Sequence, residues 1–183
     1  MKSNKKQEKK DSTEVKWFAT IFIVAFVLSI IFSFISTTAI AGLSVIPAIL
    51  VLILVVFIGI LFDVIGIAVT VGKESDFNAM AAKKIPGAKT SLNMIKNSAK
   101  VSNICADVVG DIAGVLSGAI SALIAIKITD SFGFSFNVQF IISALVASIT
   151  IGGKAIGKGL AQAHSTEIVG FAGKIVRIFD KEK

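Results

Sequence analysis

Four ionisable residues lie within long apolar stretches of this sequence, and their types and spacing are suited to chemistry. Asp63 interrupts the second apolar run, Asp107 and Asp111 open the third, and Lys154 lies late in the fourth. A lone charged side chain inside a bilayer costs about 2.5–3.5 kcal/mol on insertion scales, so such groups usually face protein or water and mark functional sites. The set has a surplus of carboxylates, whose oxygens suit a hard cation. We therefore predict that Asp63, Asp107 and Asp111 are ligands of Mg²⁺, with Lys154 as their charge partner.

A purely structural role is the alternative for the same residues. Lys154 could pair with one aspartate to hold helices together, while another aspartate stays protonated in the apolar surroundings. The sequence leaves the cation site and the structural ion pair both open.

Glycines follow the two neighbouring aspartates at helical spacing. Gly110, Gly114 and Gly118 are four residues apart, which places them on nearly the same face of a helix. Such a strip lets another helix backbone approach closely. We predict that these glycines pack against a helix, either in the same chain or in a second copy.

The amino-acid composition indicates that the apolar stretches lie in a membrane and not in water. The chain has 183 residues, of which 54% are hydrophobic and 17% charged, and its mean hydropathy is +0.84. These values predict an all-α polytopic membrane protein. The net charge of +7 is concentrated in blocks between apolar runs, which is typical of orientation signals and not of nucleic-acid binding. Cys105 is the only cysteine, so an intrachain disulfide is excluded.

Four transmembrane helices are expected within a membrane domain at 17–160. Their predicted ranges are 17–41, 45–71, 103–128 and 137–160. Residues 1–16 hold six lysines and no apolar pattern, which predicts a disordered cytoplasmic tail. Cleavage of the first span as a signal peptide after Ala41 is the alternative there.

Two basic segments are expected to lie at the membrane surface. The segment 73–102 carries six lysines and is interrupted by Pro86 and Gly87, which predicts a juxtamembrane helical hairpin. The segment 161–183 predicts an amphipathic helix with one apolar face, formed by Ile168, Phe171, Ile175 and Ile178. The positive-inside rule then places both termini and the hairpin in the cytoplasm, in a plasma-membrane protein with lipid as its partner.

Several short motifs, taken in order, resemble the transmembrane domain of the CNNM/CorB/CorC magnesium transporters. They are Leu61-Phe-Asp-Val-Ile-Gly-Ile-Ala68, the basic hairpin, Val109-Gly-Asp111 and Gly153-Lys-Ala-Ile-Gly-Lys-Gly-Leu-Ala161. The resemblance covers about residues 55–179. It implies three spans with a juxtamembrane hairpin after the first, a homodimer, and Mg²⁺ held in an inward-facing cavity.

The sequence departs from that family at its ion-binding positions. Asp63 stands where the family has a serine, Gly66 where it has a glutamate, and Asp111 where it has an asparagine. Lys154 replaces a coordinating carboxylate. The resemblance implies a non-enzymatic protein that handles or transports a divalent cation, and a lysine in the cavity could take the place of that cation.

Two other functions compete with cation handling. Phe62-Asp63 and Gly110-Asp111 resemble the paired aspartate motifs of presenilin-like intramembrane proteases, in which two carboxylates activate water. Val108 stands where that motif has its first glycine, and Lys154 has no role in that chemistry. The remaining alternative is a membrane scaffold or accessory subunit whose aspartates and lysine are structural.

Overall fold

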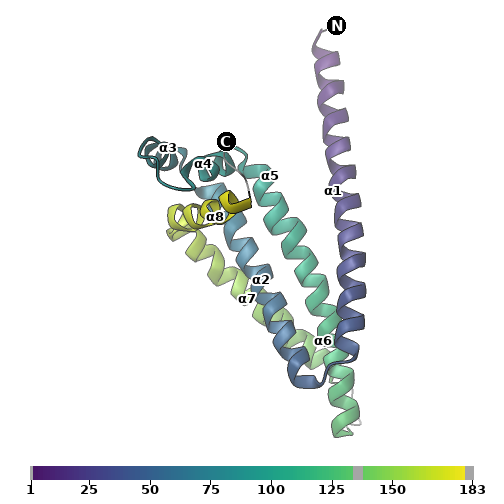
Figure 1. Ribbon diagram of the computed structural model, residues 1–183. Coiled ribbons are helices and arrows are strands. Elements are labelled where there is room, and N and C mark those ends of the chain that lie inside the picture. Colours follow the sequence, from purple (N-terminus) through teal and green to yellow (C-terminus); the bar gives the residue numbers. More distant parts are fainter. Residues whose placement is uncertain (1, 134–137, 180–183) are drawn as a thin grey trace.

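The computed structural model describes residues 2–133 and 138–179, and every element in these ranges is helical (Figure 1). The elements, in order, are α1 (Lys2–Ala41), α2 (Val45–Val71), α3 (Glu74–Ala82), α4 (Ala88–Lys96), α5 (Ser98–Ser102), the π-helix η1 (Asn103–Val109), α6 (Gly110–Phe132), α7 (Gln139–Ala163) and α8 (Ser165–Phe179). The predicted all-α class is confirmed. The last residues of the turn before the predicted fourth span and the first residue of that span, 134–137, lie outside the described residues, as does the end of the C-terminal segment, 180–183.

Among the residues whose side chains the structure describes, three helices are long and apolar enough to cross a membrane. They are Val45–Val71, Ser98–Phe132 and Gln139–Ala163, and the second of them is α5, η1 and α6 in one continuous helix. The described part of α1 includes the apolar stretch Phe18–Ile31. The fold is therefore compatible with an integral membrane protein that has at least three spans.

Helix α1 begins much earlier than the sequence pattern predicts. We expected residues 1–16 to be disordered, whereas the structure has one helix from Lys2 to Ala41. Lys, Glu and Gln are good helix formers, and adding a residue to an existing helix costs far less than starting a new one. The apolar part of α1 therefore extends its helix into the polar segment.

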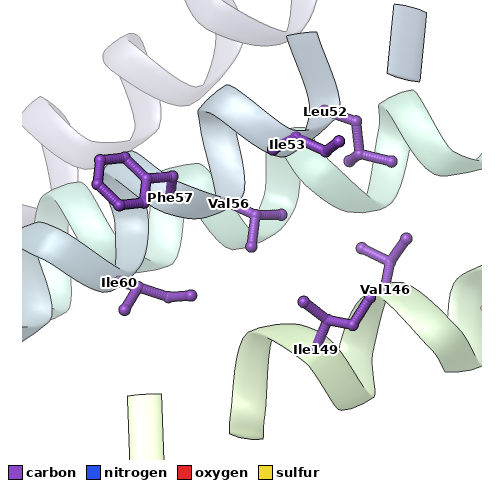
Figure 2. A pocket seen from close by; sticks show the side chains of 7 residues that line it. All are labelled: Leu52, Ile53, Val56, Phe57, Ile60, Val146 and Ile149. Atoms are coloured by element: carbon purple, nitrogen blue, oxygen red, sulfur yellow. The ribbon is translucent and has the colours of Figure 1, made fainter. Parts of the chain in front are cut away.

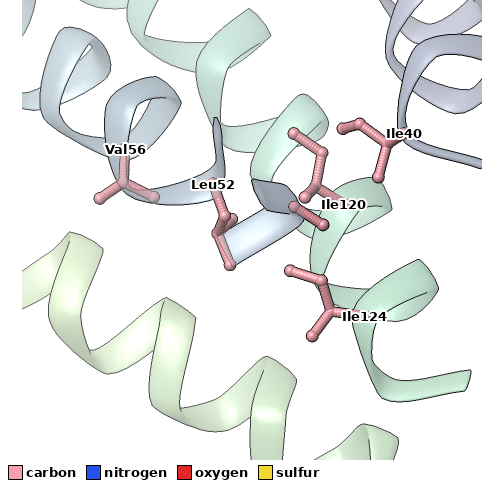
Figure 3. Close-up of a cluster of buried hydrophobic side chains, with 6 residues drawn as sticks. Ile40, Leu52, Val56, Ile120 and Ile124 are labelled. Atoms are coloured by element: carbon pink, nitrogen blue, oxygen red, sulfur yellow. The ribbon is translucent and has the colours of Figure 1, made fainter. Parts of the chain in front are cut away.

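Helix α2 is central and contacts α6, α7 and η1 along its length. Near the α1–α2 turn a cluster of buried side chains joins α1, α2 and α6 (Figure 3), made up of Ile40, Ala48, Leu52, Val56, Ile120 and Ile124. The Lys127 side chain of α6 donates a hydrogen bond of 2.6 Å to the Leu43 carbonyl in the same turn. This bond satisfies a carbonyl of the turn, which lies outside both helices and so has no helical partner.

Glycines allow the three apolar helices to pack closely. A Cβ atom at Gly59 of α2 would lie 2.8 Å from the Cβ of Ala113 in α6. A Cβ atom at Gly157 of α7 would lie 2.5 Å from Cγ2 of Val64 in α2. These distances are shorter than van der Waals contact, so only glycine fits the observed helix separations.

Helices α3, α4 and α8 form a platform at the end of the bundle opposite the α1–α2 turn (Figure 1). The Ser91 hydroxyl of α4 donates to the Val169 carbonyl of α8 at 3.0 Å. The Thr166 hydroxyl of α8 donates to Asp76 of α3 at 3.2 Å. Gly87 has a φ of +84° and touches the backbone of Lys174. The two short helices are thereby held against α8.

Candidate ion-pair site between α2, α6 and α7

Asp63 and Lys154 meet between α2 and α7. The Lys154 Nζ lies 3.7 Å from Asp63 Oδ1, and the two side chains are 31% and 15% exposed. Both residues belong to helices that are apolar enough to cross a membrane. In such surroundings each charge lowers the cost of burying the other, so the pair stabilises the α2–α7 contact.

Gly110 at the start of α6 completes the surroundings of the ammonium group. A Cβ atom added at Gly110 would lie 3.6 Å from the Lys154 Nζ. The ammonium therefore sits where α2, α6 and α7 meet, against a bare stretch of α6 backbone. A large side chain at position 110 would occupy the space into which Lys154 extends.

The packing of α7 on α2 determines where Lys154 lies. Gly153 packs against Ile60 and Gly157 against Val64, and these contacts are one helical turn apart on both helices. Lys154 follows Gly153 directly, and Asp63 precedes Val64. The glycine contacts thus set the distance between the two charged residues.

Asp107 and Asp111 do not join this pair. Both are exposed on the surface of η1 and α6. Successive residues of an α-helix point about 100° apart, so Asp111 turns outward when Gly110 faces Lys154. Among the described residues no three His, Cys, Asp or Glu side chains are grouped so that they could hold a metal ion. The structure unites Asp63 with Lys154 and separates them from the other two predicted ligands.

Of the three predicted packing glycines, only Gly110 has a close neighbour among the described residues. Gly114 and Gly118 are exposed, and a Cβ atom on either would have no neighbour within 4 Å. The close helix contacts within the chain use Gly59, Gly66, Gly153 and Gly157 instead. Gly114 and Gly118 lie on the same outer surface as Asp111, which leaves this surface open to a second molecule.

The π-helix η1 was not predicted from the sequence. It spans Asn103–Val109, and the Gly110 N–H bonds to the Cys105 carbonyl five residues earlier. Its residues pack on Gly66 of α2, where a Cβ atom would lie 3.3 Å from the Cβ of Cys105. Single π-helical turns inside α-helices occur frequently at functional sites. Here the turn directly precedes the glycine that borders Lys154, and no residue pattern in 103–109 marks it.

An apolar cavity lies between α2 and α7 (Figure 2). It has a volume of about 230 Å³ and is lined by hydrocarbon side chains, namely Leu52, Ile53, Val56, Phe57, Ile60, Val146 and Ile149. With no polar atom to orient a cation or activate water, this cavity offers no chemistry. The chemistry of the described bundle is therefore concentrated at the ion pair.

Comparison of the chain with protein-family models, curated proteins and solved structures found no match.

Proposed function

We propose that this chain is a CNNM/CorB-like integral plasma-membrane protein that handles a divalent cation, with Mg²⁺ as its cargo. In this proposal Lys154 is a tethered cation that holds the site when no metal is bound. The observation that supports it is the position of the Lys154 ammonium, 3.7 Å from Asp63 and against the bare backbone at Gly110. That is the space between three helices in which a carboxylate-bound ion would lie.

At this site the Lys154 ammonium balances the formal charge of the Asp63 carboxylate when no metal is bound. The Lys154 side chain is 31% exposed, so it has room to swing away from Asp63 on a long, flexible stem. Entry of the cation then requires displacement of one ammonium and not a rearrangement of the helices.

The outer surface of α6 supports assembly as a homodimer. Asp107 and Asp111 are exposed there beside Gly114 and Gly118. Carboxylates facing lipid are costly, and small residues permit close contact between helices. A second copy packed on this surface would remove the carboxylates from lipid.

The proposed topology has four spans, with α1 as the first, and places both termini and the platform in the cytoplasm. The distribution of lysine and arginine supports this orientation. In a background without Cys105, single cysteines at positions 78–98 should react with a reagent from the cytoplasmic side, and a cysteine at Ser131 should react from outside. Outside labelling of Lys89→Cys would contradict the orientation.

The decisive experiment for cation handling is Lys154→Gln. Neutralising the ammonium should raise the affinity for Mg²⁺ at least about tenfold, because a positive charge about 4 Å from a cation is strongly repulsive at protein dielectric constants. The readout is the Mg²⁺ concentration that raises the unfolding temperature, since a ligand of the native state stabilises it by mass action. Asp63→Asn with Lys154→Gln is the control and should lose the effect. The proposal would be refuted if millimolar Mg²⁺ and Ca²⁺ left the unfolding temperatures of both the wild type and Lys154→Gln unchanged.

A membrane scaffold is the second candidate. The observation that favours it is that Asp63 and Lys154 already neutralise each other, while Asp107 and Asp111 face outward. A scaffold predicts that Asp63→Asn lowers stability, because it leaves Lys154 without its partner. It also predicts that no variant responds to metal.

A further inference from the structure

The platform has an apolar surface that the rest of the chain leaves uncovered. Val169, Ala172 and Gly173 of α8 are buried on the side that packs against the hairpin. Phe171 and Ile178, which lie on the opposite side of α8, are 66% and 77% exposed. A helix held on one face and apolar on the other is suited to lie in a membrane interface.

Basic side chains surround this surface. The segments 73–100 and 165–179 hold eight lysine or arginine residues and three aspartate or glutamate residues. Two of the acids already have partners, because Glu74 lies 3.5 Å from Lys96 and Asp76 accepts a hydrogen bond from Thr166. The excess of positive charge complements the anionic lipids of a cytoplasmic leaflet.

The turn between α3 and α4 contacts α8 through Gly87, which packs on the backbone of Lys174. Lys83 and Lys84 at the start of this turn are exposed, as is Lys89 in the first turn of α4. A cavity of about 400 Å³ opens between the turn and α8, with Pro86, Glu167, Phe171 and Lys174 among its lining residues. The cavity thus lies between Phe171 of the apolar surface and Pro86 of the turn, and Lys174 is its basic lining residue.

Lys84 occupies a backbone conformation that favours glycine. Its φ is +54°, and among the described residues no other non-glycine residue has a positive φ. Its N–H bonds to the Ala81 carbonyl at 2.9 Å, and the Ile85 N–H bonds to the Met80 carbonyl at 3.1 Å. This is the pattern of a Schellman motif, in which glycine is the usual residue at the left-handed position. A lysine there strains the backbone, so glycine at position 84 would make the folded state more stable. The presence of lysine is therefore not explained by stability.

We propose that the platform binds the headgroup of an anionic phospholipid, with Lys84 and Lys174 facing its phosphate and Phe171 inserted among the acyl chains. The inference rests on the membrane placement proposed above and is independent of cation handling. Because free phosphate offers the same chemistry as the headgroup, the test includes inorganic phosphate as a separate arm.

The test uses the purified full chain in a nonionic detergent, titrated with phosphatidylglycerol or with phosphatidylcholine, with the unfolding temperature as readout and no divalent cation present. Phosphatidylglycerol should stabilise the wild type and phosphatidylcholine should not. Lys84→Gly should raise the unfolding temperature without lipid by about 2–4 °C, through loss of strain. The same variant should need about fivefold more phosphatidylglycerol for half of the stabilisation, since one lysine near an anionic surface contributes about that factor.

The control variants separate the effect of the Lys84 charge on lipid binding from the effect of its backbone strain. Lys84→Asn keeps a residue that tolerates positive φ and should weaken phosphatidylglycerol binding like the glycine variant. Lys96→Gln, on a lysine that is paired with Glu74, should leave it unchanged. Equal lipid titrations for wild type and Lys84→Gly would overturn the proposal, as would equal stabilisation by inorganic phosphate at the same concentration.

Discussion

Replacing Gly157 by alanine tests the packing that holds Lys154 beside Asp63. The added Cβ atom would lie 2.5 Å from Cγ2 of Val64, whereas ordinary contact begins at about 3.4 Å. Val64 is β-branched and has little freedom to turn its methyl group aside, so α7 must move away from α2 by about 1 Å. Overpacking of this kind costs about 1–3 kcal/mol.

Gly159→Ala is the matched control on the same helix, because nothing lies within 4 Å of a Cβ atom there. Both substitutions gain the same helix propensity, about 1 kcal/mol relative to glycine, and this gain cancels in the comparison. Gly157→Ala should therefore be less stable than Gly159→Ala by about 1–3 kcal/mol, which corresponds to roughly 2–12 °C in unfolding temperature for a chain of this size. Thermal unfolding in detergent micelles measures the difference. Equal stability of the two variants would show that α7 does not pack on α2 through Gly157.

Three further predictions concern the bundle. Asp63→Asn and Lys154→Met should each lower the free energy of unfolding, and the double variant should lose less than the sum of the two single losses. A double-mutant cycle should give a coupling free energy of about 1–2 kcal/mol, whereas additive losses would mean that the pair does not interact. Gly114→Leu should convert a dimer into monomers without changing the thermal stability of the monomer, since no described residue lies within 4 Å of a Cβ atom at Gly114. Light scattering on a purified sample measures the oligomeric state, and an intact dimer would place the interface elsewhere. Lys127→Met should lower the free energy of unfolding by about 1.5–3 kcal/mol through loss of a charged hydrogen bond to the Leu43 carbonyl. It should also speed amide hydrogen exchange in the α1–α2 turn, and unchanged exchange would contradict a role of Lys127 in stabilising that turn.

The apolar helices are the part of the fold that the sequence predicted well. Predicted span 45–71 coincides with α2, Val45–Val71, because a long, predominantly apolar run has one stable form in a bilayer, a helix of sufficient length. The polar segment before the first span was interpreted wrongly as disordered. Its composition describes an isolated segment, whereas in the chain it continues an existing helix.

The apolar runs suggested that Lys154 pairs with one of the three aspartates, and the structure places it beside Asp63. The sequence could not show that Asp107 and Asp111 would face outward. Their spacing indicates that they share a face but carries no information about which neighbour that face meets. The π-helical turn just before Gly110 also changes the helical register there.

What the sequence determined by itself is the helical class, the apolar runs and the cost of each charge within them, since these follow from residue type and length. The tertiary structure decided which glycines make close contacts. Gly157 contacts Val64, while a Cβ atom at Gly114, in an equally suitable pattern, would have no described neighbour within 4 Å. Contact between helices depends on their mutual rotation and separation, and both are set by all the side chains between them at once.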